Sequence, residues 1–113
     1  MAELLEVVEK TLDDKLAENI VCIDMRNANP FNDYFVICTS KNLRHAQSLA
    51  EFVEEEAFKQ GYDVRVKEGD KESPWVLVDL NEVVVHIFLQ EARDMYRLEA
   101  LWADQPQTPY EAK

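Results

Sequence analysis

Three segments of the chain carry hydrophobic residues at helical spacing: residues 3–18, 43–59 and 91–102. In the first segment the apolar stripe consists of Leu5, Val8, Leu12 and Leu16. In the last segment it consists of Met95, Leu98 and Trp102. Ser40 or Asn42 is expected to cap the middle helix, because either side chain can accept a hydrogen bond from the first turn. The pattern therefore predicts three amphipathic helices.

Five shorter segments have the apolar runs or the alternation typical of β-strands: residues 20–25, 34–39, 63–67, 75–80 and 83–89. The last two segments flank Asn81 and Glu82. Asparagine tolerates a left-handed backbone, so this pair of residues predicts a tight hairpin.

The order of the segments predicts the fold class, which is α+β: a five-stranded mixed sheet with helices packed on it. The strand–helix–strand unit over residues 34–67 is expected to cross over right-handed and to place its two strands parallel. A chain of 113 residues is one domain by length, which we expect to span residues 1–103. Residues 104–113 contain two prolines and no apolar pattern, which predicts a flexible C-terminal tail.

The charge of the chain changes which partners are expected. The formal net charge is −11 at pH 7. Direct binding to nucleic acid usually starts from a basic patch, and a chain this acidic is repelled by phosphate. We therefore expect no direct DNA binding and favour a basic protein partner, although the charge could also serve solubility alone.

The cysteines and the N-terminus bear on where the protein acts. Cys22 and Cys38 lie in apolar strand segments, form no CxxC motif and have no histidine at zinc spacing, so we expect buried free thiols in a reducing compartment. The N-terminal segment is acidic and amphipathic, unlike a signal peptide, and no apolar run approaches the length of a membrane span. The expected location is the cytoplasm, away from membranes.

The sequence lacks the motifs that common enzyme classes need. Gly61 and Gly69 are the only glycines, so there is no glycine-rich phosphate loop, and neither HExxH nor GxSxG occurs. A nucleotidyl transferase needs two acidic residues two positions apart on a strand to hold its metal ions. Here the strand after the long helix reads DVRV, with Arg65 at the second position. We therefore expect no catalytic residue, no cofactor and no metal ion.

Two residues of the segment WVLVDLNEVVVHIF leave more than one interpretation open. His86 could be a base, a metal ligand or a neutral core residue, and Asp79 across the hairpin could orient it. A histidine among apolar neighbours is more often structural, because a base also needs a substrate within reach. Trp75, at the start of its strand, could be an interface anchor or could cover the end of the sheet as ordinary core.

Four stretches of this chain resemble one family, the ribosomal silencing factors, also called iojap-related proteins. They are DYFVICTS (33–40), RHAQSLAEFVEEE (44–56), WVLVDLNEVVVHIF (75–88) and EARDMYRLEALW (91–102). The family usually has Gly-Asp where this chain has Asn81 and Glu82. It often has Gly-Thr-Ser where this chain has residues 40–42, which leaves the conformation of that loop open.

The resemblance implies a fold similar to nucleotidyl transferases but without their catalytic carboxylates. It also implies a function, which is to bind the large ribosomal subunit through its protein number fourteen. Bound there, the domain would block the small subunit and repress translation under nutrient limitation. The alternatives are a large-subunit assembly factor and a degenerate nucleotidyl transferase that still uses ATP. A homodimer of the free protein is also left open.

The resemblance and the charge together suggest residues for partner binding. Trp75 is assigned as the apolar anchor. The acidic contacts to lysines or arginines are assigned to Asp79, Glu82 and Glu91. Arg93 and Tyr96 match the family motif, and could bind the partner or be structural. His86 is interpreted as a structural member of the sheet.

Overall fold

The computed structural model describes residues 3–111. The helices in this part of the chain are α1 (Leu4–Asp14), α2 (Leu43–Lys59), α3 (Gln90–Tyr96) and α4 (Leu98–Leu101). The strands are β1 (Glu18–Asp24), β2 (Tyr34–Ser40), β3 (Val66–Glu68), β4 (Trp75–Asp79), β5 (Val83–Leu89) and β6 (Gln107–Pro109). The predicted α+β class is confirmed, and Asn42 rather than Ser40 caps α2 by accepting from the backbone N–H of His45.

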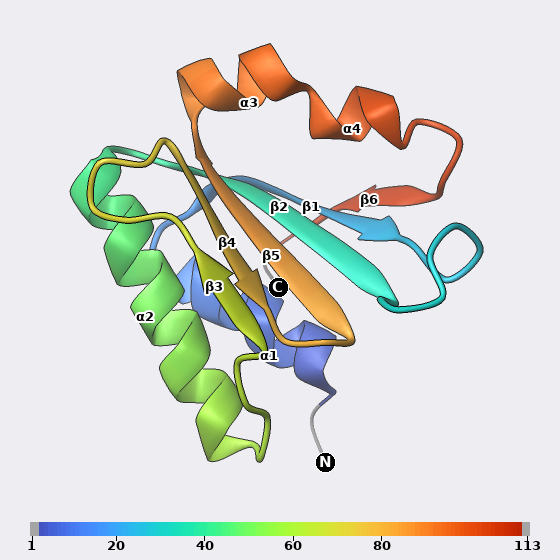
Figure 1. Ribbon diagram of the computed structural model, residues 1–113, viewed down its shortest axis with the longest axis horizontal. Helices are drawn as coiled ribbons and strands as arrows, with labels where there is room; N and C mark the ends of the chain where they lie inside the picture. The colour runs from blue at the N-terminus through green and yellow to red at the C-terminus, as the bar shows by residue number, and fades with distance from the viewer. Residues whose placement is uncertain (1–2, 112–113) are drawn as a thin grey trace.

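The described strands form one mixed sheet in the order β3-β4-β5-β2-β1-β6 (Figure 1). β2 and β5 are parallel neighbours at its centre, and the other neighbouring pairs are antiparallel. β3 therefore runs in the same direction as β2, as the strand–helix–strand unit predicts. The two strands are not adjacent, however, because the β4–β5 hairpin lies between them.

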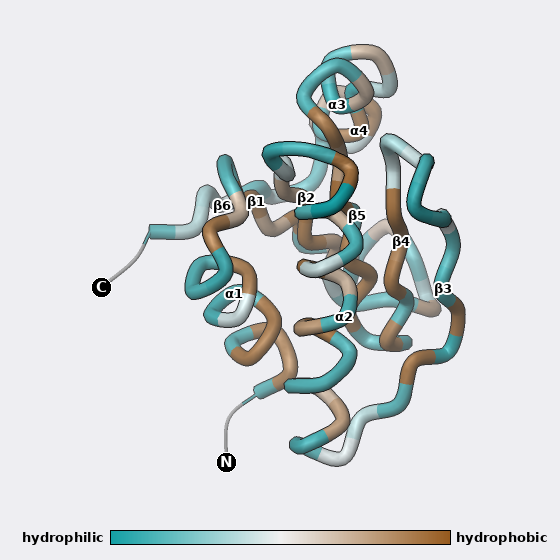
Figure 2. Tube along the Cα trace, turned by 90° about the vertical axis from the view of Figure 1, so that its left-hand side faces the viewer, coloured by the Kyte–Doolittle hydropathy of each residue, from teal (hydrophilic) through white to brown (hydrophobic). Residues whose placement is uncertain are grey.

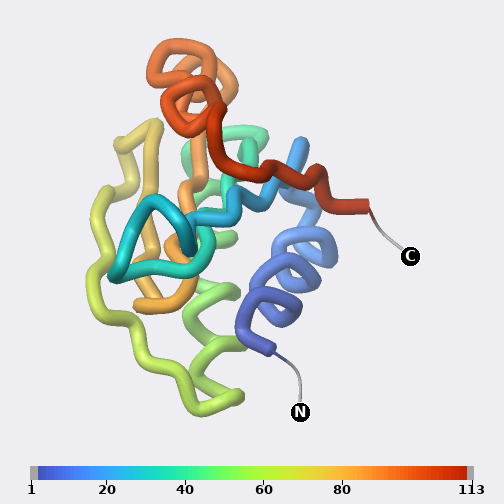
Figure 3. Tube along the Cα trace, turned by 90° about the vertical axis from the view of Figure 1, so that its right-hand side faces the viewer, coloured from blue at the N-terminus to red at the C-terminus, as the bar shows by residue number. Residues whose placement is uncertain are grey.

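Within residues 3–111 the sheet has six strands, where the sequence predicts five. β6 pairs antiparallel with β1 and lies beside it in Figure 3. The backbone N–H of Tyr110 donates to the carbonyl of Ile20 at 2.8 Å, and the N–H of Asp24 donates to Pro106 at 2.9 Å. Much of the segment predicted to be a flexible tail is therefore held by the edge of the sheet. Residues 112 and 113 lie outside the described part of the chain.

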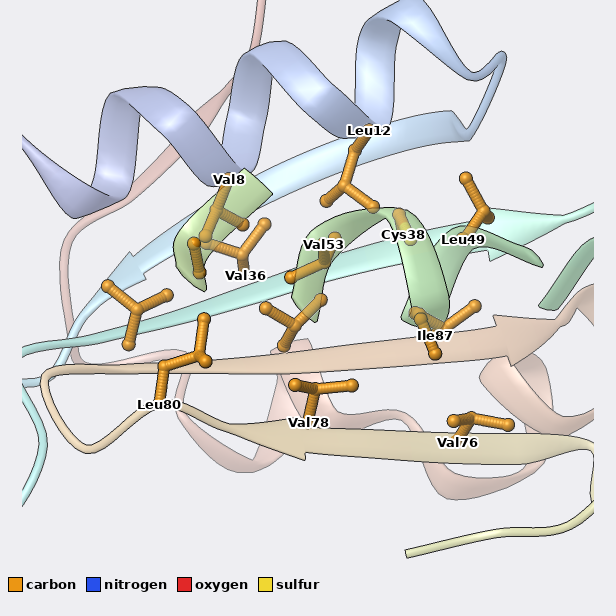
Figure 4. Packing of buried hydrophobic residues seen from close by; sticks show 14 of the residues in the cluster. Val8, Leu12, Val36, Cys38, Leu49, Val53, Val76, Val78, Leu80 and Ile87 are labelled. Atoms are coloured by element: carbon orange, nitrogen blue, oxygen red, sulfur yellow. The ribbon is translucent and has the colours of Figure 1, made fainter. Parts of the chain in front are cut away.

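α1 and α2 pack side by side on one face of the sheet (Figure 2). Their apolar stripes meet the side chains of one parity from the central strands, which excludes water from the main core (Figure 4). The fully buried members include Val8, Leu12, Val36, Cys38, Leu49, Val53, Val76, Val78 and Ile87.

α1 ends four residues before the predicted boundary at residue 18. Leu16 has φ of +69° and is 62% exposed, so it closes the helix instead of joining the apolar stripe. The backbone N–H of Ala17 donates to the carbonyl of Leu12 at 2.9 Å, as in a helix that ends on a left-handed residue.

The predicted helix over residues 91–102 is divided in two. Arg97 has φ of +49°, which ends α3, and α4 begins at the next residue. The single stripe predicted there is therefore wrong. Met95 is 73% exposed, whereas Leu98 is buried.

The turn between β4 and β5 is predicted correctly as one that needs a left-handed residue. Asn81 has φ of +76°, and its backbone N–H donates to Oδ1 of Asp79 at 2.8 Å. We expect Asn81→Val to lower the free energy of unfolding by about 1–2 kcal/mol, because a β-branched residue is strained at positive φ. Asn81→Gly should stay within about 1 kcal/mol of the parent. Urea unfolding checks both, and equal stability of the two variants would contradict the explanation.

Candidate functional site: an aromatic face of the sheet

The sheet face opposite α1 and α2 carries a connected group of rings. We call it the aromatic face, and its members are Phe35, Trp75, His86, Phe88, Tyr96 and Trp102. Trp75 lies centrally, with its ring centroid 4.9 Å from Phe88 and 4.8 Å from Tyr96. α3 and α4 lie across one end of the sheet, and most of this face has no helix over it (Figure 1).

Strand alternation explains why these rings share a face. Val76 and Val78 of β4 point into the main core, so Trp75 and Leu77 point to the opposite side. Across the antiparallel pair, Trp75 is opposite Phe88 and Leu77 is opposite His86. Trp75 and Leu77 are only half-buried. The β5 side chains beside them, His86 and Phe88, are buried, so the apolar surface that reaches solvent on this face comes from β4.

His86 is buried beneath these rings and is hydrogen-bonded to one of them, Trp75. Nε1 of Trp75 donates to Nδ1 of His86 at 3.2 Å, and the Phe35 ring centroid is 4.8 Å from the imidazole. Burial lowers the pKa of His86 to about 4, although the nearby Asp79 charge acts in the opposite direction. His86 is therefore neutral at neutral pH, in line with the interpretation of His86 as structural.

Asp79 does not orient His86. It lies opposite Val84 in the hairpin, is 6% exposed, and has both oxygens occupied. Oδ2 accepts from Nη2 of Arg65 at 2.6 Å, and Oδ1 accepts from the backbone N–H of Asn81. The acid–base pair considered from the sequence is not formed.

The buried histidine predicts a specific dependence of stability on pH. Burial disfavours the protonated imidazole only in the folded protein. Above pH about 6.5 the histidine is neutral in both the folded and the unfolded state, and its protonation costs the folded state nothing. As the pH falls from about 6.5 toward about 4, the unfolded state binds the proton first and the free energy of unfolding decreases. We expect this residue to account for about 2 kcal/mol of lost stability between pH 7.5 and pH 5. Urea unfolding of the parent and of His86→Asn is measured at pH 7.5 and at pH 5. Both proteins have the same carboxylates, so the difference between their losses of stability isolates the effect of His86. Equal losses in the two proteins would refute the assignment.

The other residues predicted for partner binding are spread over two ends of the sheet. Tyr96 contacts Trp75 and is 52% exposed, and Glu91 is exposed on the same helix, α3. Glu82 is exposed in the hairpin turn, next to the buried Asp79, at the other end of β4 and β5. The structure thus brings Trp75 and Tyr96 together but leaves Asp79 and Glu82 in a separate group.

Arg93 is turned into the protein. Its side chain is 8% exposed. Nη1 donates to the carbonyl of Asn19 at 2.7 Å and to Oγ1 of Thr39 at 2.9 Å, while Nε and Nη2 donate to the carboxylate of Glu99. These contacts connect α3 with α4 and with the ends of β1 and β2. They favour a structural role over direct contact with a partner.

Phe35 of the aromatic face, and Leu77 on the same side of the sheet, are not among the residues that the sequence predicts for partner binding. The sequence could have indicated Leu77, because it lies two positions after Trp75 and therefore points to the same side of the strand. Phe35 could not be found this way, because its neighbour β5 is distant in the chain.

The described residues, 3–111, contain no group of three or more His, Cys, Asp or Glu side chains placed to hold a metal ion. Within that range no helix is both long enough and apolar enough to cross a bilayer. Cys22 and Cys38 are buried free thiols, and burial raises the pKa of each to about 12.

Fold and site together define a class: a small α+β domain with two helices on one sheet face and aromatic side chains on the other. Comparison with known proteins identifies the family. The model of the family "Ribosomal silencing factor during starvation" matches residues 1–113. The chain belongs to this family of ribosomal silencing factors, whose name describes a ribosome regulatory factor rather than an enzyme.

Three relatives show how far the similarity extends. A ribosomal silencing factor from Bacillus subtilis is 40% identical over 91% of this chain and 87% of its own length. The crystal structure of a Chromobacterium violaceum protein superposes with a TM-score of 0.83 at 30% identity, covering 98% of this chain and 95% of that one. A mouse protein named for mitochondrial assembly of the large ribosomal subunit is 30% identical over 87% of this chain and 44% of its own length.

Proposed function

We propose that this protein binds the large ribosomal subunit in the cytoplasm through protein number fourteen of that subunit. It thereby blocks association with the small subunit and represses translation when nutrients are limiting. Membership of the ribosomal silencing factor family is the observation that carries the proposal. The aromatic face supports it, because a half-buried tryptophan beside an exposed tyrosine is typical of an interface anchor.

The proposed contact is centred on Trp75 and Tyr96. Their rings are adjacent and both reach solvent, so they can supply the apolar centre of an interface. Glu91 on α3 and Glu82 in the hairpin are exposed and can meet lysines or arginines at the rim. Asp79 and Arg93 act through the fold, because their hydrogen-bonding groups are engaged internally.

The net charge supports a basic protein partner beside ribosomal RNA. A charge of −11 attracts a basic protein surface and is repelled by the phosphates around it. The attraction favours binding at the protein component of the subunit, and the repulsion disfavours other positions on it.

A second candidate function is assembly of the large subunit, favoured by the name of the mouse relative. The same face would then dock on precursors of the subunit. Sedimentation profiles of ribosomes from cells lacking the protein separate the two functions. Accumulated precursors of the large subunit would indicate a role in assembly. Mature subunits that remain joined as whole ribosomes under starvation would indicate silencing.

Sedimentation with purified ribosomal subunits tests the main proposal. We expect the protein to travel with large subunits, not with small ones, and to lower the yield of joined ribosomes. Protein that stays at the top of the gradient at every concentration would refute the proposal. In that case a thermal-shift titration with ATP and magnesium tests for a nucleotide site, since a ligand that binds only the folded state raises Tm.

The oligomeric state of the free protein is tested in the same preparation. A second copy of the chain could cover the aromatic face, since exposed apolar surface of this kind also favours self-association. Sedimentation equilibrium of the free protein, with Trp75→Ala alongside, shows whether a dimer forms through this face.

A further inference from the structure

The hydrogen bond between Trp75 and His86 determines which part of the indole a partner can meet. Nε1 of Trp75 donates to Nδ1 of His86 at 3.2 Å. His86 is 4% exposed and lies between Phe35 and Trp75, whereas Trp75 is half-buried. The N–H edge of the indole is thus turned inward. The part of the ring that reaches solvent is carbon.

We propose that His86 is the positioning residue for Trp75 in partner binding. This inference rests on the proposed function and deepens it. With its N–H engaged inside the protein, Trp75 offers a partner an apolar and π-electron surface and no hydrogen-bond donor. The partner group that fits it is an aliphatic side chain, or the stem and cation of a lysine or arginine, rather than a carbonyl acceptor.

Stability alone does not account for a histidine at this position. Because Nδ1 accepts a hydrogen bond, the proton of the neutral ring lies on Nε2. Nε2 is buried and has no hydrogen-bond partner among the described residues. A buried polar group without a partner opposes folding, and an apolar side chain of similar size would avoid that penalty. A positioning role gives the histidine a function that leucine cannot supply.

Two substitutions separate positioning from packing. His86→Leu fills the site without an acceptor, and His86→Asn retains an acceptor, because its Oδ1 can occupy the place of Nδ1. We expect His86→Leu to keep its stability at neutral pH but to weaken binding to purified large subunits by about three- to tenfold. His86→Asn should restore most of that loss.

A double-mutant cycle with Trp75→Phe gives the deciding result. Phenylalanine has no N–H, so His86→Leu should have no further effect on binding in the Trp75→Phe background. An equal loss in both backgrounds would show that His86 acts through packing and would overturn the proposal. Unchanged binding of His86→Leu in the parent background would overturn it as well.

The free protein provides a readout that does not depend on the ribosome. The exchange of the Trp75 indole N–H with solvent, followed by NMR, should be slow in the parent and in His86→Asn but faster in His86→Leu. Fast exchange in the parent would remove the bond on which the proposal rests. If the parent fails to bind large subunits, the proposed function fails and the binding role of His86 fails with it. Slow indole exchange would then still assign His86 as the residue that orients Trp75.

Discussion

Trp75→Ala is expected to lower the affinity for the large ribosomal subunit by at least about 30-fold, which corresponds to about 2 kcal/mol. The indole is in contact with Phe88 and Tyr96 and is already half-buried before binding. It is therefore held rigidly, and little side-chain entropy is lost when a partner covers the rest of it. Titration of the protein against purified large subunits, followed by sedimentation, measures the change.

The matched control for this variant is Phe58→Ala. Phe58 is an aromatic residue that is 69% exposed on α2, in the helical layer on the other side of the sheet. Its loss should leave affinity unchanged within about twofold. Thermal unfolding of both variants shows whether the fold is kept. A folded Trp75→Ala protein that binds as well as the parent would contradict the assignment of Trp75 as the anchor. An equal loss of affinity with Phe58→Ala would show that the interface is not confined to the aromatic face.

Arg93→Leu is expected to lower the free energy of unfolding by about 3 kcal/mol. The substitution leaves the carbonyl of Asn19 and the carboxylate of Glu99 without the donor that now satisfies them. It also removes one of the contacts that hold α4 at the end of the sheet, since the guanidinium joins Glu99 to Thr39. Arg93→Lys should recover less than half of the loss, since an ammonium lacks the planar fork that reaches all three acceptors.

Urea unfolding of the Arg93 variants is compared with that of Arg44→Leu. Arg44 is exposed on α2, so its replacement should change stability by less than about 0.5 kcal/mol. The double variant Arg93→Leu with Glu99→Leu should regain part of the stability, because it removes the unpaired carboxylate. Arg93→Leu as stable as the parent would show that the buried arginine does not hold the C-terminal helices to the sheet.

The central strands and the long helix could be predicted from the sequence because their local patterns agree with their burial. β2 and β5 are covered on both faces for most of their length, and accordingly they are continuous runs of apolar residues. α2 carries its apolar residues on one stripe, and Asn42 stands where a cap is needed. Asn81 predicted the turn because the position needs a positive φ, which few residues other than glycine and asparagine tolerate.

The features that were missed depend on contacts between distant segments. β6 is short and mostly exposed, and its strand conformation comes from pairing with β1 rather than from its own residues. Nothing in the local pattern marks Arg97 as left-handed, because arginine usually continues a helix. The predicted two-residue turn does fix the register of β4 with β5, which places Trp75 opposite Phe88. The bond from Trp75 to His86 runs diagonally across this pair, however, and depends on side-chain rotamers that the strand pattern does not specify.

The parallel pairing of β2 with β5 also has a consequence for the order of folding. Tyr34 is opposite Val83, about 50 positions further along the chain. The β1–β2 and β4–β5 hairpins can form from neighbouring segments, but the centre of the sheet closes only when the two hairpins dock, with α2 and β3 between them in the chain. Contacts of such long range slow folding relative to a helical bundle of the same size. During synthesis, the inner edge of β2 stays unpaired until β5 has been made, so the nascent chain carries an open strand edge for much of its translation.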